Sequence, residues 1–275
     1  MLGDIMQHER IYLDPEHPEV YLDTYIANNR TALRDAMLVI PGGGYSQVCT
    51  GREGEPIAFA FLALGYNCFV LNYRVNNVPY PAQLTDASRA MVHIRENAEK
   101  YNINKNRVFA VGFSAGGHLA GSLGILHADK SVLGTLGINE GDNRPDGVIL
   151  CYPVVSALLP THEPSFEHLT GGTPFAEIPE ETKRALSLEV NVDKSSSPAF
   201  IWHTALDALV PTNGSLALAQ RYVDTGLPVM MKLYPYGPHG LALSNRFTAE
   251  GNPAQCQPIA ERWIREADEW LKTLA

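Results

Sequence analysis

An uninterrupted apolar run, RVFAVGF (residues 107–113), leads into Ser114 and then into a stretch of small residues, AGGHLAGSLGILH. Consecutive Val, Phe and Ala positions are typical of a strand that is buried on both faces, because a strand with one wet face alternates apolar and polar residues. The stretch that follows has the composition and spacing of a helix. A buried strand that passes directly into a helix indicates a sheet covered by helices on both sides.

The same alternation of strand and helix recurs along the chain. Further apolar runs with strand character lie at 36–42, 68–75, 146–155, 198–205 and 229–237. Segments with helical spacing lie at 57–67, 85–101, 214–226 and 258–274. This alternation predicts an α/β fold with a mostly parallel central sheet. The early segments IYLD and VYLDTYIA are expected to add an antiparallel edge.

Residues 156–197 interrupt this alternation. They contain several prolines, the stretch SFEHLTGG and a short charged segment with helical character, EIPEETKRALSLE. We interpret 156–197 as an insertion or cap segment near the top of the sheet and not as a second domain. The whole chain, 1–275, is then a single domain, since an α/β domain of this length can bury a large core.

Charge and composition argue against several classes of partner. The chain has 21 Lys and Arg against 30 Asp and Glu, a net charge of −9 and no basic run, so nucleic acid and anionic membranes are poor partners. It lacks an apolar span of membrane length, and MLGDIMQHERIYLD lacks the pattern of a signal peptide. We therefore expect a cytoplasmic protein. Its four cysteines are widely spaced without a CxxC pair, which favours free thiols, and we expect no metal and no cofactor.

Ser114 is the first candidate for chemistry. It lies between Gly112 and Gly116 at a junction of strand and helix, and this GxSxG pattern is typical of a nucleophile elbow. Side chains at the two flanking positions would collide with neighbouring backbone. Ligands of open α/β sheets bind at the carboxyl ends of strands, and a helix N-terminus there favours a developing oxyanion. The motif alone also fits a tight junction of strand and helix whose serine takes no part in chemistry. Whether Ser114 is a nucleophile therefore depends on finding its partner residues elsewhere in the chain.

A nucleophilic serine needs a histidine base, and the histidine needs an orienting carboxylate. In sheets of this kind the three follow in the order serine, carboxylate, histidine. Asp207 comes just after the strand predicted at 198–205, and His239 just after the strand predicted at 229–237. The sequence therefore predicts a catalytic triad of Ser114, Asp207 and His239.

Other histidines and acids fit this order less well. His118 lies inside the helix four residues after the serine, and we expect it to be a packed structural histidine, with a supporting role left open. His203 lies within a strand and precedes the acid. Three further histidines lie in the insertion or at a helix end, where we expect solvent exposure: His127, His162 and His168. Two rival acids, Asp193 and Asp224, do not directly follow a strand.

The stretch PGGGY, residues 41–45, follows a buried strand and is expected to form a binding loop. Consecutive glycines let the backbone approach a substrate carbonyl. An oxyanion hole needs two or more backbone N–H donors, and we predict Gly43, Gly44 and Ala115 for this role. Tyr45 could wall the acyl pocket. A phosphate-binding loop does not fit, because no GK[ST] follows the glycines.

Together, LVIPGGGY, GFSAGGHLA, LCYPV, WHTALDALVP and PHGL resemble the α/β-hydrolase esterases related to acetyl xylan esterases and other small carbohydrate acetylesterases. The resemblance covers about residues 36–275. It implies an α/β-hydrolase fold, with the family's triad carried onto Ser114, Asp207 and His239. The glycine loop resembles the HGGG motif of lipases and esterases, but Pro41 stands where histidine is common. The hydrogen bond from that histidine to the loop is therefore absent.

From these residues we expect a serine carboxylesterase that hydrolyses short-chain acyl esters, with acetylated sugars as the substrate class that the resemblance implies. Two alternatives stay open. One is a serine peptidase of the prolyl-oligopeptidase type, which usually carries a large additional domain that 275 residues do not accommodate. The other is a non-catalytic binding protein on the same fold, although such proteins typically lose a triad residue. The sequence also leaves a homodimer open.

Overall fold

The protein is described by a computed structural model that covers residues 6–28 and 32–274. Over these ranges eight strands form one sheet in the order β1-β2-β4-β3-β5-β6-β7-β8. Every neighbouring pair from β4 to β8 is parallel, whereas β1 and β2 join the edge antiparallel. The strands are β1 (Met6–Tyr12), β2 (Tyr21–Ala27), β3 (Arg34–Ile40), β4 (Asn67–Asn72), β5 (Ile103–Phe113), β6 (Val148–Cys151), β7 (Ala199–Thr204) and β8 (Val229–Tyr234). The predicted mostly parallel sheet with an antiparallel edge is confirmed.

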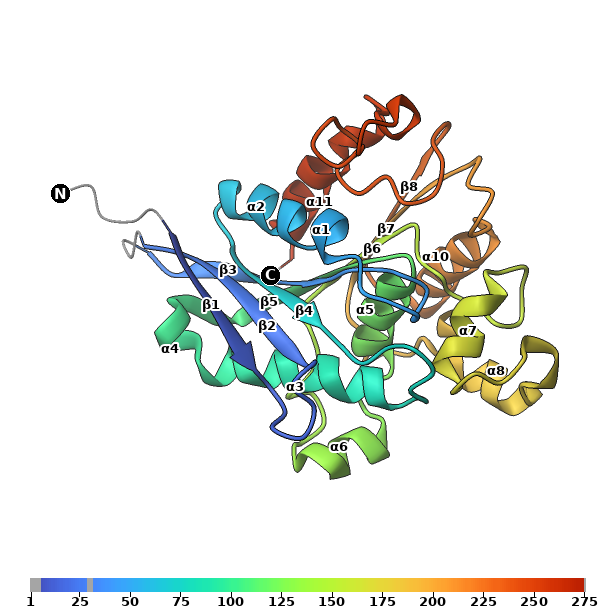
Figure 1. Cartoon of the computed structure of the whole chain (residues 1–275), viewed down its shortest axis with the longest axis horizontal. Coiled ribbons are helices and arrows are strands. Elements are labelled where there is room, and N and C mark those ends of the chain that lie inside the picture. Colours follow the sequence, from blue (N-terminus) through green and yellow to red (C-terminus); the bar gives the residue numbers. More distant parts are fainter. Residues whose placement is uncertain (1–5, 29–31, 275) are drawn as a thin grey trace.

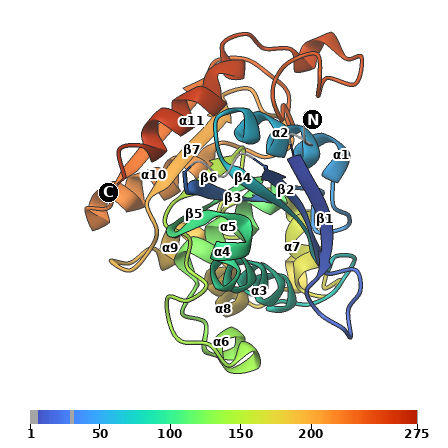
Figure 2. The same cartoon turned by 90° about the vertical axis from the view of Figure 1, so that its left-hand side faces the viewer.

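Helices cover both faces of this sheet, as Figures 1 and 2 show. On one face pack α2 (Glu55–Ala63) and α11 (Trp263–Leu271). On the other pack α3 (Ala82–Glu96), α5 (Ala115–Ile125) and α10 (Asn213–Thr225). The inner strands β3 to β7 thus lie between two helical layers, which explains why their apolar residues are consecutive, whereas the edge strand β8 is only half-buried.

Strand β3 illustrates how the two layers share one strand. Leu38 and Ile40 belong to the apolar cluster with α3 and α5, whereas Met37 and Val39 belong to the cluster with α2 and α11. All four side chains are 0% exposed. Successive strand residues point to opposite faces, so both sets must be apolar when both faces are covered.

The observed elements differ from the predicted ones mainly at their ends. Strand β6 stops before Pro153, which has no N–H to donate to a ladder. The helix predicted at 85–101 is divided at Asn97, and the one at 258–274 begins with a 3₁₀ turn. The sequence analysis did not predict three of the short helices, α1, α6 and α7. The short helices are α1 (Thr50–Glu53), α4 (Ala98–Tyr101), α6 (Lys130–Leu136), α7 (Glu163–Leu169), α8 (Glu180–Leu186) and α9 (Leu188–Asn191), with 3₁₀ turns at Phe175–Glu177, Pro253–Gln255 and Ala260–Arg262.

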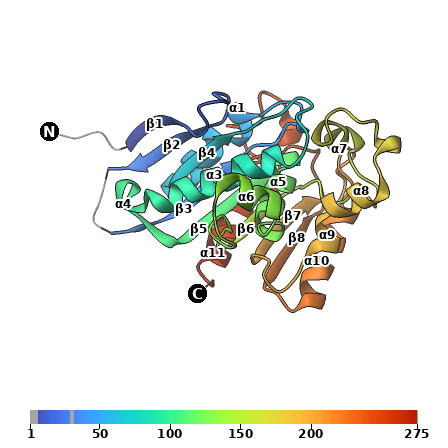
Figure 3. The same ribbon diagram turned by 90° about the horizontal axis from the view of Figure 1, so that it is seen from below.

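Residues 156–197 fold into α7, α8, α9 and a 3₁₀ turn. Seen from below, α7 and α8 stand at the end of the molecule opposite the N-terminal strands (Figure 3). Helix α9 packs against α5 and α10, which joins the segment to the sheet-covering helices. That this segment is an insertion in a single domain 1–275 stays a prediction.

Four further expectations concern the chain as a whole. Cys49, Cys68, Cys151 and Cys256 are all unpaired, as the sequence predicts. Within the described ranges, no helix is both long and apolar enough to cross a bilayer. The first five residues, part of the stretch in which no signal peptide is expected, lie outside the described residues. A homodimer stays a prediction.

Candidate active site

Ser114 occupies the turn between β5 and α5, with φ of 53° and ψ of −119°. A positive φ is strained for a residue with a side chain and persists only where surrounding packing enforces it. Neither flanking glycine can be replaced by a residue with a side chain. A Cβ on Gly112 would lie 2.1 Å from the Gly116 carbonyl oxygen, and one on Gly116 would lie 2.3 Å from the Pro41 carbonyl oxygen. The predicted steric reason for the GxSxG pattern is confirmed.

The three residues predicted as a triad lie together at the carboxyl ends of β5, β7 and β8. Ser114 Oγ is 2.8 Å from His239 Nε2, and His239 Nδ1 is 2.7 Å from Asp207 Oδ2. These distances allow hydrogen bonds through both nitrogens of one imidazole. Ser114 is only 9% exposed, so the hydroxyl opens to solvent through a narrow surface.

Asp207 is fixed from several sides. Its side chain is 0% exposed, and the backbone N–H groups of Leu209 and Val210 each donate to Oδ1 at 2.9 Å. Burial alone would raise the pKa of Asp207, but hydrogen bonds from His203 and His239 outweigh it and hold that pKa well below its ordinary value. The carboxylate is therefore charged over the whole range of neutral pH.

His203 is a residue that the sequence analysis set aside because of its position in the chain. Its Nε2 lies 3.2 Å from Asp207 Oδ2 and 3.0 Å from the Val210 carbonyl oxygen. Both of these atoms accept, so Nε2 carries the proton, and Nδ1 accepts from the Ser215 hydroxyl at 2.9 Å. His203 thus donates to the same carboxylate oxygen as His239. The signal in the sequence that could have identified His203 is its position four residues before Asp207, in HTALD.

The glycine loop, residues 41–45, faces Ser114. Gly43 and Gly44 have φ of 127° and 64°, and both line the pocket that Ser114 opens into. Ala115 is the first residue of α5, where helix geometry leaves an N–H without an intrahelical acceptor. Over residues 6–28 and 32–274 no backbone acceptor pairs with the N–H of any of these three residues. Tyr73 Oη donates to the Pro41 carbonyl at 2.8 Å and holds the start of the loop.

Tyr45 does not occupy the position that we predicted for it. Its side chain is 2% exposed, packs against Tyr73 and is not among the residues that line the pocket. Its Oη lies 2.8 Å from His118 Nδ1, so the ring turns inward to meet α5. Tyr45 therefore supports the glycine loop from beneath and does not wall an acyl pocket.

His118 is packed as expected. It is 1% exposed, and its Nε2 lies 2.8 Å from the carbonyl oxygen of Leu186 at the end of α8. A carbonyl oxygen only accepts, so Nε2 donates and Nδ1 accepts the Tyr45 proton. Burial lowers the pKa of His118 to about 4, and the imidazole is neutral at neutral pH. His118 joins the glycine loop to the 156–197 segment.

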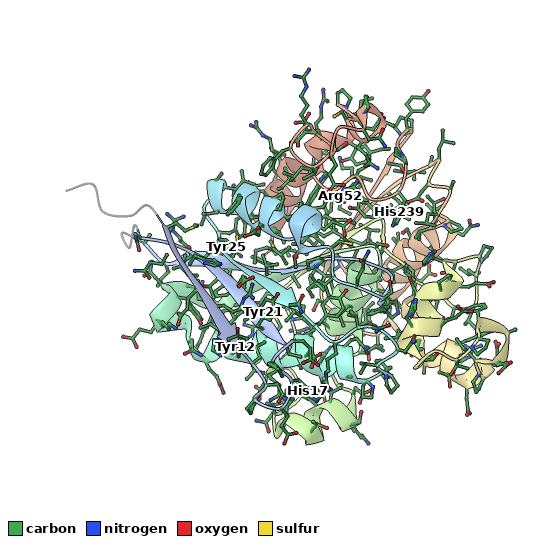
Figure 4. The ribbon with its side chains drawn as sticks, viewed as in Figure 1. Tyr12, His17, Tyr21, Tyr25, Arg52 and His239 are labelled. Carbon is green, nitrogen blue, oxygen red and sulfur yellow. The ribbon has the colours of Figure 1, made fainter. Side chains whose placement is uncertain are left out.

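The pocket above Ser114 has a volume of about 410 Å³, and both polar and apolar side chains line it. Arg52 lines it and donates to the Gly240 carbonyl oxygen, and Figure 4 shows Arg52 beside His239. The lining residues are Gly43, Gly44, Ser46, Cys49, Arg52, Glu53, Ser114, His162, Pro164, His168, Leu209, His239 and Gly240. Over the described ranges no group of three His, Cys, Asp or Glu side chains is arranged to hold a metal ion.

The expectation of exposure for three histidines is wrong in part. His162 and His168 are half-buried and line the pocket, because α7 brings them over the carboxyl ends of the strands. His162 Nδ1 lies 2.9 Å from Ser165 Oγ, and burial together with nearby His239 lowers the pKa of His162. His127 is 2% exposed at the end of α5, where neighbouring segments cover it. Asp193 instead caps the turn at Ser195 and Ser196, away from the pocket.

Glu53 is a second residue that the sequence analysis missed. Its side chain lies beneath the pocket at 5% exposure, and Oε2 accepts the N–H of Gly42 at 2.9 Å. The neighbouring carboxylate Glu55 is exposed on the same segment and bonds Tyr25. No local pattern in REGEP separates the buried glutamate from the exposed one.

Comparisons with known proteins show what the whole chain is similar to. The family described as BD-FAE matches residues 22–222. The chain is 40% identical to endo-1,4-beta-xylanase B of Butyrivibrio fibrisolvens over 79% of this chain and 34% of that protein. It is 28% identical to the acetylxylan esterase of Xylanibacter ruminicola over 87% of this chain and 45% of that protein. The chain thus spans about a third to a half of the length of these relatives.

Among solved structures, an acetyl ester-xyloside bifunctional hydrolase from Caldicellulosiruptor lactoaceticus is similar over 98% of both chains, with a TM-score of 0.82 and 31% identity. This match includes the sheet, its covering helices and the 156–197 segment, since it leaves almost none of either chain out.

Proposed function

The chain belongs to the BD-FAE family, and from this premise we propose that it is a serine carboxylesterase that removes short acyl groups, chiefly acetyl, from sugar esters. The α/β-hydrolase fold class expected from the sequence is confirmed by the sheet order and the full-length structural match. The observation that carries the proposal is the hydrogen-bonded line from Ser114 through His239 to Asp207.

In the proposed reaction, His239 Nε2 takes the Ser114 proton as Oγ bonds to the ester carbonyl carbon. The carbonyl oxygen becomes an oxyanion that accepts hydrogen bonds from the N–H groups of Gly43, Gly44 and Ala115. Collapse of this intermediate breaks the bond to the alcohol, which leaves with the proton from His239. Water then gives a proton to His239, attacks the acyl carbon and releases the acid, and Ser114 regains its proton.

Asp207 has a different task from the other two residues. It accepts a hydrogen bond from the Nδ1–H group of His239 and so fixes the tautomer in which Nε2 is free to accept from Ser114. Its negative charge also stabilises the imidazolium that forms when the serine proton moves. Because its pKa lies well below the ordinary value, Asp207 stays ionised while His239 gains and loses protons.

The substrate class rests on the relatives and on the walls of the pocket. The named relatives include an acetylxylan esterase and an acetyl ester-xyloside hydrolase. Arg52, Ser46 and His162 offer polar atoms around the mouth of the pocket, which suits the hydroxyl groups of a sugar. These features favour an ester of a polar alcohol over a peptide bond.

The test compares wild type with Ser114→Ala on p-nitrophenyl acetate. We expect turnover to fall by roughly four orders of magnitude or more, since the nucleophile and its covalent intermediate are lost. A fluorophosphonate should label the wild type and not the variant, whereas a non-catalytic binding protein would not be labelled. Activity near wild type in Ser114→Ala would refute the proposal, and a preference for aminoacyl p-nitroanilides would favour the peptidase.

A further inference from the structure

We propose that Glu53 and Tyr152 form a positioning bridge, which holds the glycine loop (residues 41–45) and the histidine loop (residues 237–242) in one fixed relation. The inference rests on the proposed function, because it assigns the oxyanion donors to the first loop and the general base to the second. Neither Glu53 nor Tyr152 is a catalytic residue here. Each acts through the backbone that it holds.

The hydrogen bonds of the bridge have determined directions. The N–H of Ala242 donates to Tyr152 Oη at 2.9 Å, and the Tyr152 hydroxyl donates to Glu53 Oε1 at 2.8 Å. The N–H of Gly42 donates to Glu53 Oε2 at 2.9 Å. A backbone N–H can only donate, so the single proton of Tyr152 is left for the glutamate. Both carboxylate oxygens of Glu53 therefore accept, one from each of the two loops' partners, Gly42 and Tyr152.

Burial makes these bonds selective for one arrangement. Ala242 is 0%, Tyr152 2% and Glu53 5% exposed, so water does not replace a partner that is lost. Burial and the nearby Glu53 raise the pKa of Tyr152 well above its ordinary value, and its hydroxyl keeps the proton that the bridge needs. The histidine loop is further fixed by Trp263, whose Nε1 donates to the Ala242 carbonyl at 2.9 Å.

The tyrosine ring also contacts the proposed base directly. The rings of Tyr152 and His239 meet edge to face, with centroids 5.0 Å apart and an interplanar angle of 72°. Trp202 packs on the same tyrosine at 5.0 Å and 89°. The imidazole therefore has a fixed apolar neighbour, and a shift of the phenol would be passed to both His239 and the loop that carries it.

The glutamate compensates for a feature noted in the sequence. Pro41 replaces the histidine that commonly begins such a glycine loop, so the loop lacks that side-chain anchor. Glu53 anchors the next residue, Gly42, from below. A Cβ on Gly42 would lie 2.8 Å from Glu53 Oε2 and 3.0 Å from Ser114 Cβ. The carboxylate therefore lies close to the nucleophile. Its hydrogen bond to Gly42 sets the position of the neighbouring oxyanion donors, Gly43 and Gly44, relative to Ser114.

The experiment measures kcat and KM for p-nitrophenyl acetate in Tyr152→Phe, Glu53→Gln and the double variant. Tyr152→Phe keeps the ring on His239 and breaks the bridge, and we expect kcat to fall about 10- to 100-fold with KM changed less than about threefold. Glu53→Gln keeps an acceptor for Gly42 and should lose less, about 3- to 10-fold. The double variant should lose no more than Tyr152→Phe, because one bridge is broken in both.

Tyr66→Phe is the matched control. Tyr66 Oη donates to Asp268 Oδ1 at 3.0 Å, so this variant removes the same kind of tyrosine–carboxylate bond outside the pocket. It should leave kcat unchanged, which separates loss of a buried bond in general from loss of the bridge. Thermal unfolding of each variant verifies that it is folded, and Glu53→Gln decides the matter if Tyr152→Phe does not fold.

The inference is overturned if Tyr152→Phe keeps kcat within twofold of wild type, or if the losses in the double variant multiply. Failure of the proposed function gives a different result. In that case Ser114→Ala would retain activity and fluorophosphonate would not label the protein, whatever the bridge variants do.

Discussion

Two sides of the pocket are built in different ways. One side is carried by the sheet, where Ser114, Asp207 and His239 follow the strands β5, β7 and β8. The side chains of Asp207 and His239 are 0% and 14% exposed. The other side is carried by α7, which places His162 and His168, both half-buried, over the same opening. The first side is held by several hydrogen bonds per residue, and the second by one bond for each histidine ring.

This difference assigns the chemical step to the sheet side of the pocket and the choice of substrate to the α7 side. Geometry that must hold to a few tenths of an ångström belongs on rigid elements, and the sheet provides them. A short helical segment at the mouth can differ in sequence without disturbing the strand ends, and loops of this kind commonly decide which ligand fits. We therefore expect substitutions on the sheet side to change turnover for every ester. Substitutions on the α7 side should change the preference among alcohols.

The first prediction concerns His118, which joins the two sides through Tyr45 and Leu186. Its pKa is about 4 in the folded protein and about 6.5 when unfolded. Between these values the unfolded chain binds more protons, so stability is complete above about pH 6.5 and falls as the pH drops towards 4. His118 contributes up to about 3 kcal/mol to this loss.

Chemical denaturation at several pH values between 4 and 7 measures this contribution. Wild type should lose more unfolding free energy over this interval than His118→Gln, which cannot titrate there. Other histidines with lowered pKa, such as His93 and His127, are common to both proteins and cancel in the difference. Equal slopes in the two proteins would mean that His118 is not buried at the joint.

The second prediction concerns His203 and stays on the sheet side. His203→Leu removes the Nε2 donor from Asp207, so the carboxylate loses a bond that lowers its pKa and fixes its rotamer. We expect kcat to fall about tenfold on both p-nitrophenyl acetate and an acetylated oligosaccharide, since a charge-assisted bond is worth roughly 1.5 to 3 kcal/mol. His203→Gln should restore most of kcat, because its amide can donate from nearly the same place.

Ser215→Ala is the control for this variant. It removes the other hydrogen bond of His203, from the Ser215 hydroxyl to Nδ1, and leaves the donor to Asp207 in place. Its kcat should stay within about threefold of wild type. If His203→Leu and His203→Gln lose the same activity, His203 contributes packing and not a positioned proton.

The residues on the sheet side were also the ones that could be predicted from the sequence. Ser114 and its glycines form a contiguous motif, and Asp207 and His239 follow strands that apolar runs reveal. His203 was set aside because it precedes the acid in the chain, whereas Glu53 and Tyr152 were missed because their partners lie on other elements. The burial of Glu53 depends on two partners, the backbone N–H of Gly42 and the phenol of Tyr152, which directly follows β6. Neither partner leaves a pattern in the sequence around Glu53. Tyr45 was misplaced because the direction of its ring is set by His118, 73 residues away.

The α7 side was less predictable for a related reason. His162 lies seven residues after the strand predicted at 146–155, and no pattern in THEPSF predicts that this turn returns to Ser114. The distance from Ser114 along the chain carries no information about their distance in space. Only the fold of the whole 156–197 segment, which α9 fastens to α5 and α10, brings the imidazole to the pocket.

The third prediction tests the α7 side and has the smallest expected effect. Since Nδ1 of His162 is engaged with Ser165, Nε2 is the nitrogen left for a hydroxyl group of the alcohol. His162→Phe keeps an aromatic ring but removes both ring nitrogens, and with them the bond to Ser165. We expect KM for an acetylated xylo-oligosaccharide to rise about three- to tenfold, the value of one hydrogen bond, with kcat unchanged. For p-nitrophenyl acetate, whose leaving group has no hydroxyl at that position, kcat/KM should stay within twofold. An equal loss on both esters would place His162 with the sheet-borne residues and abolish the division between the two sides.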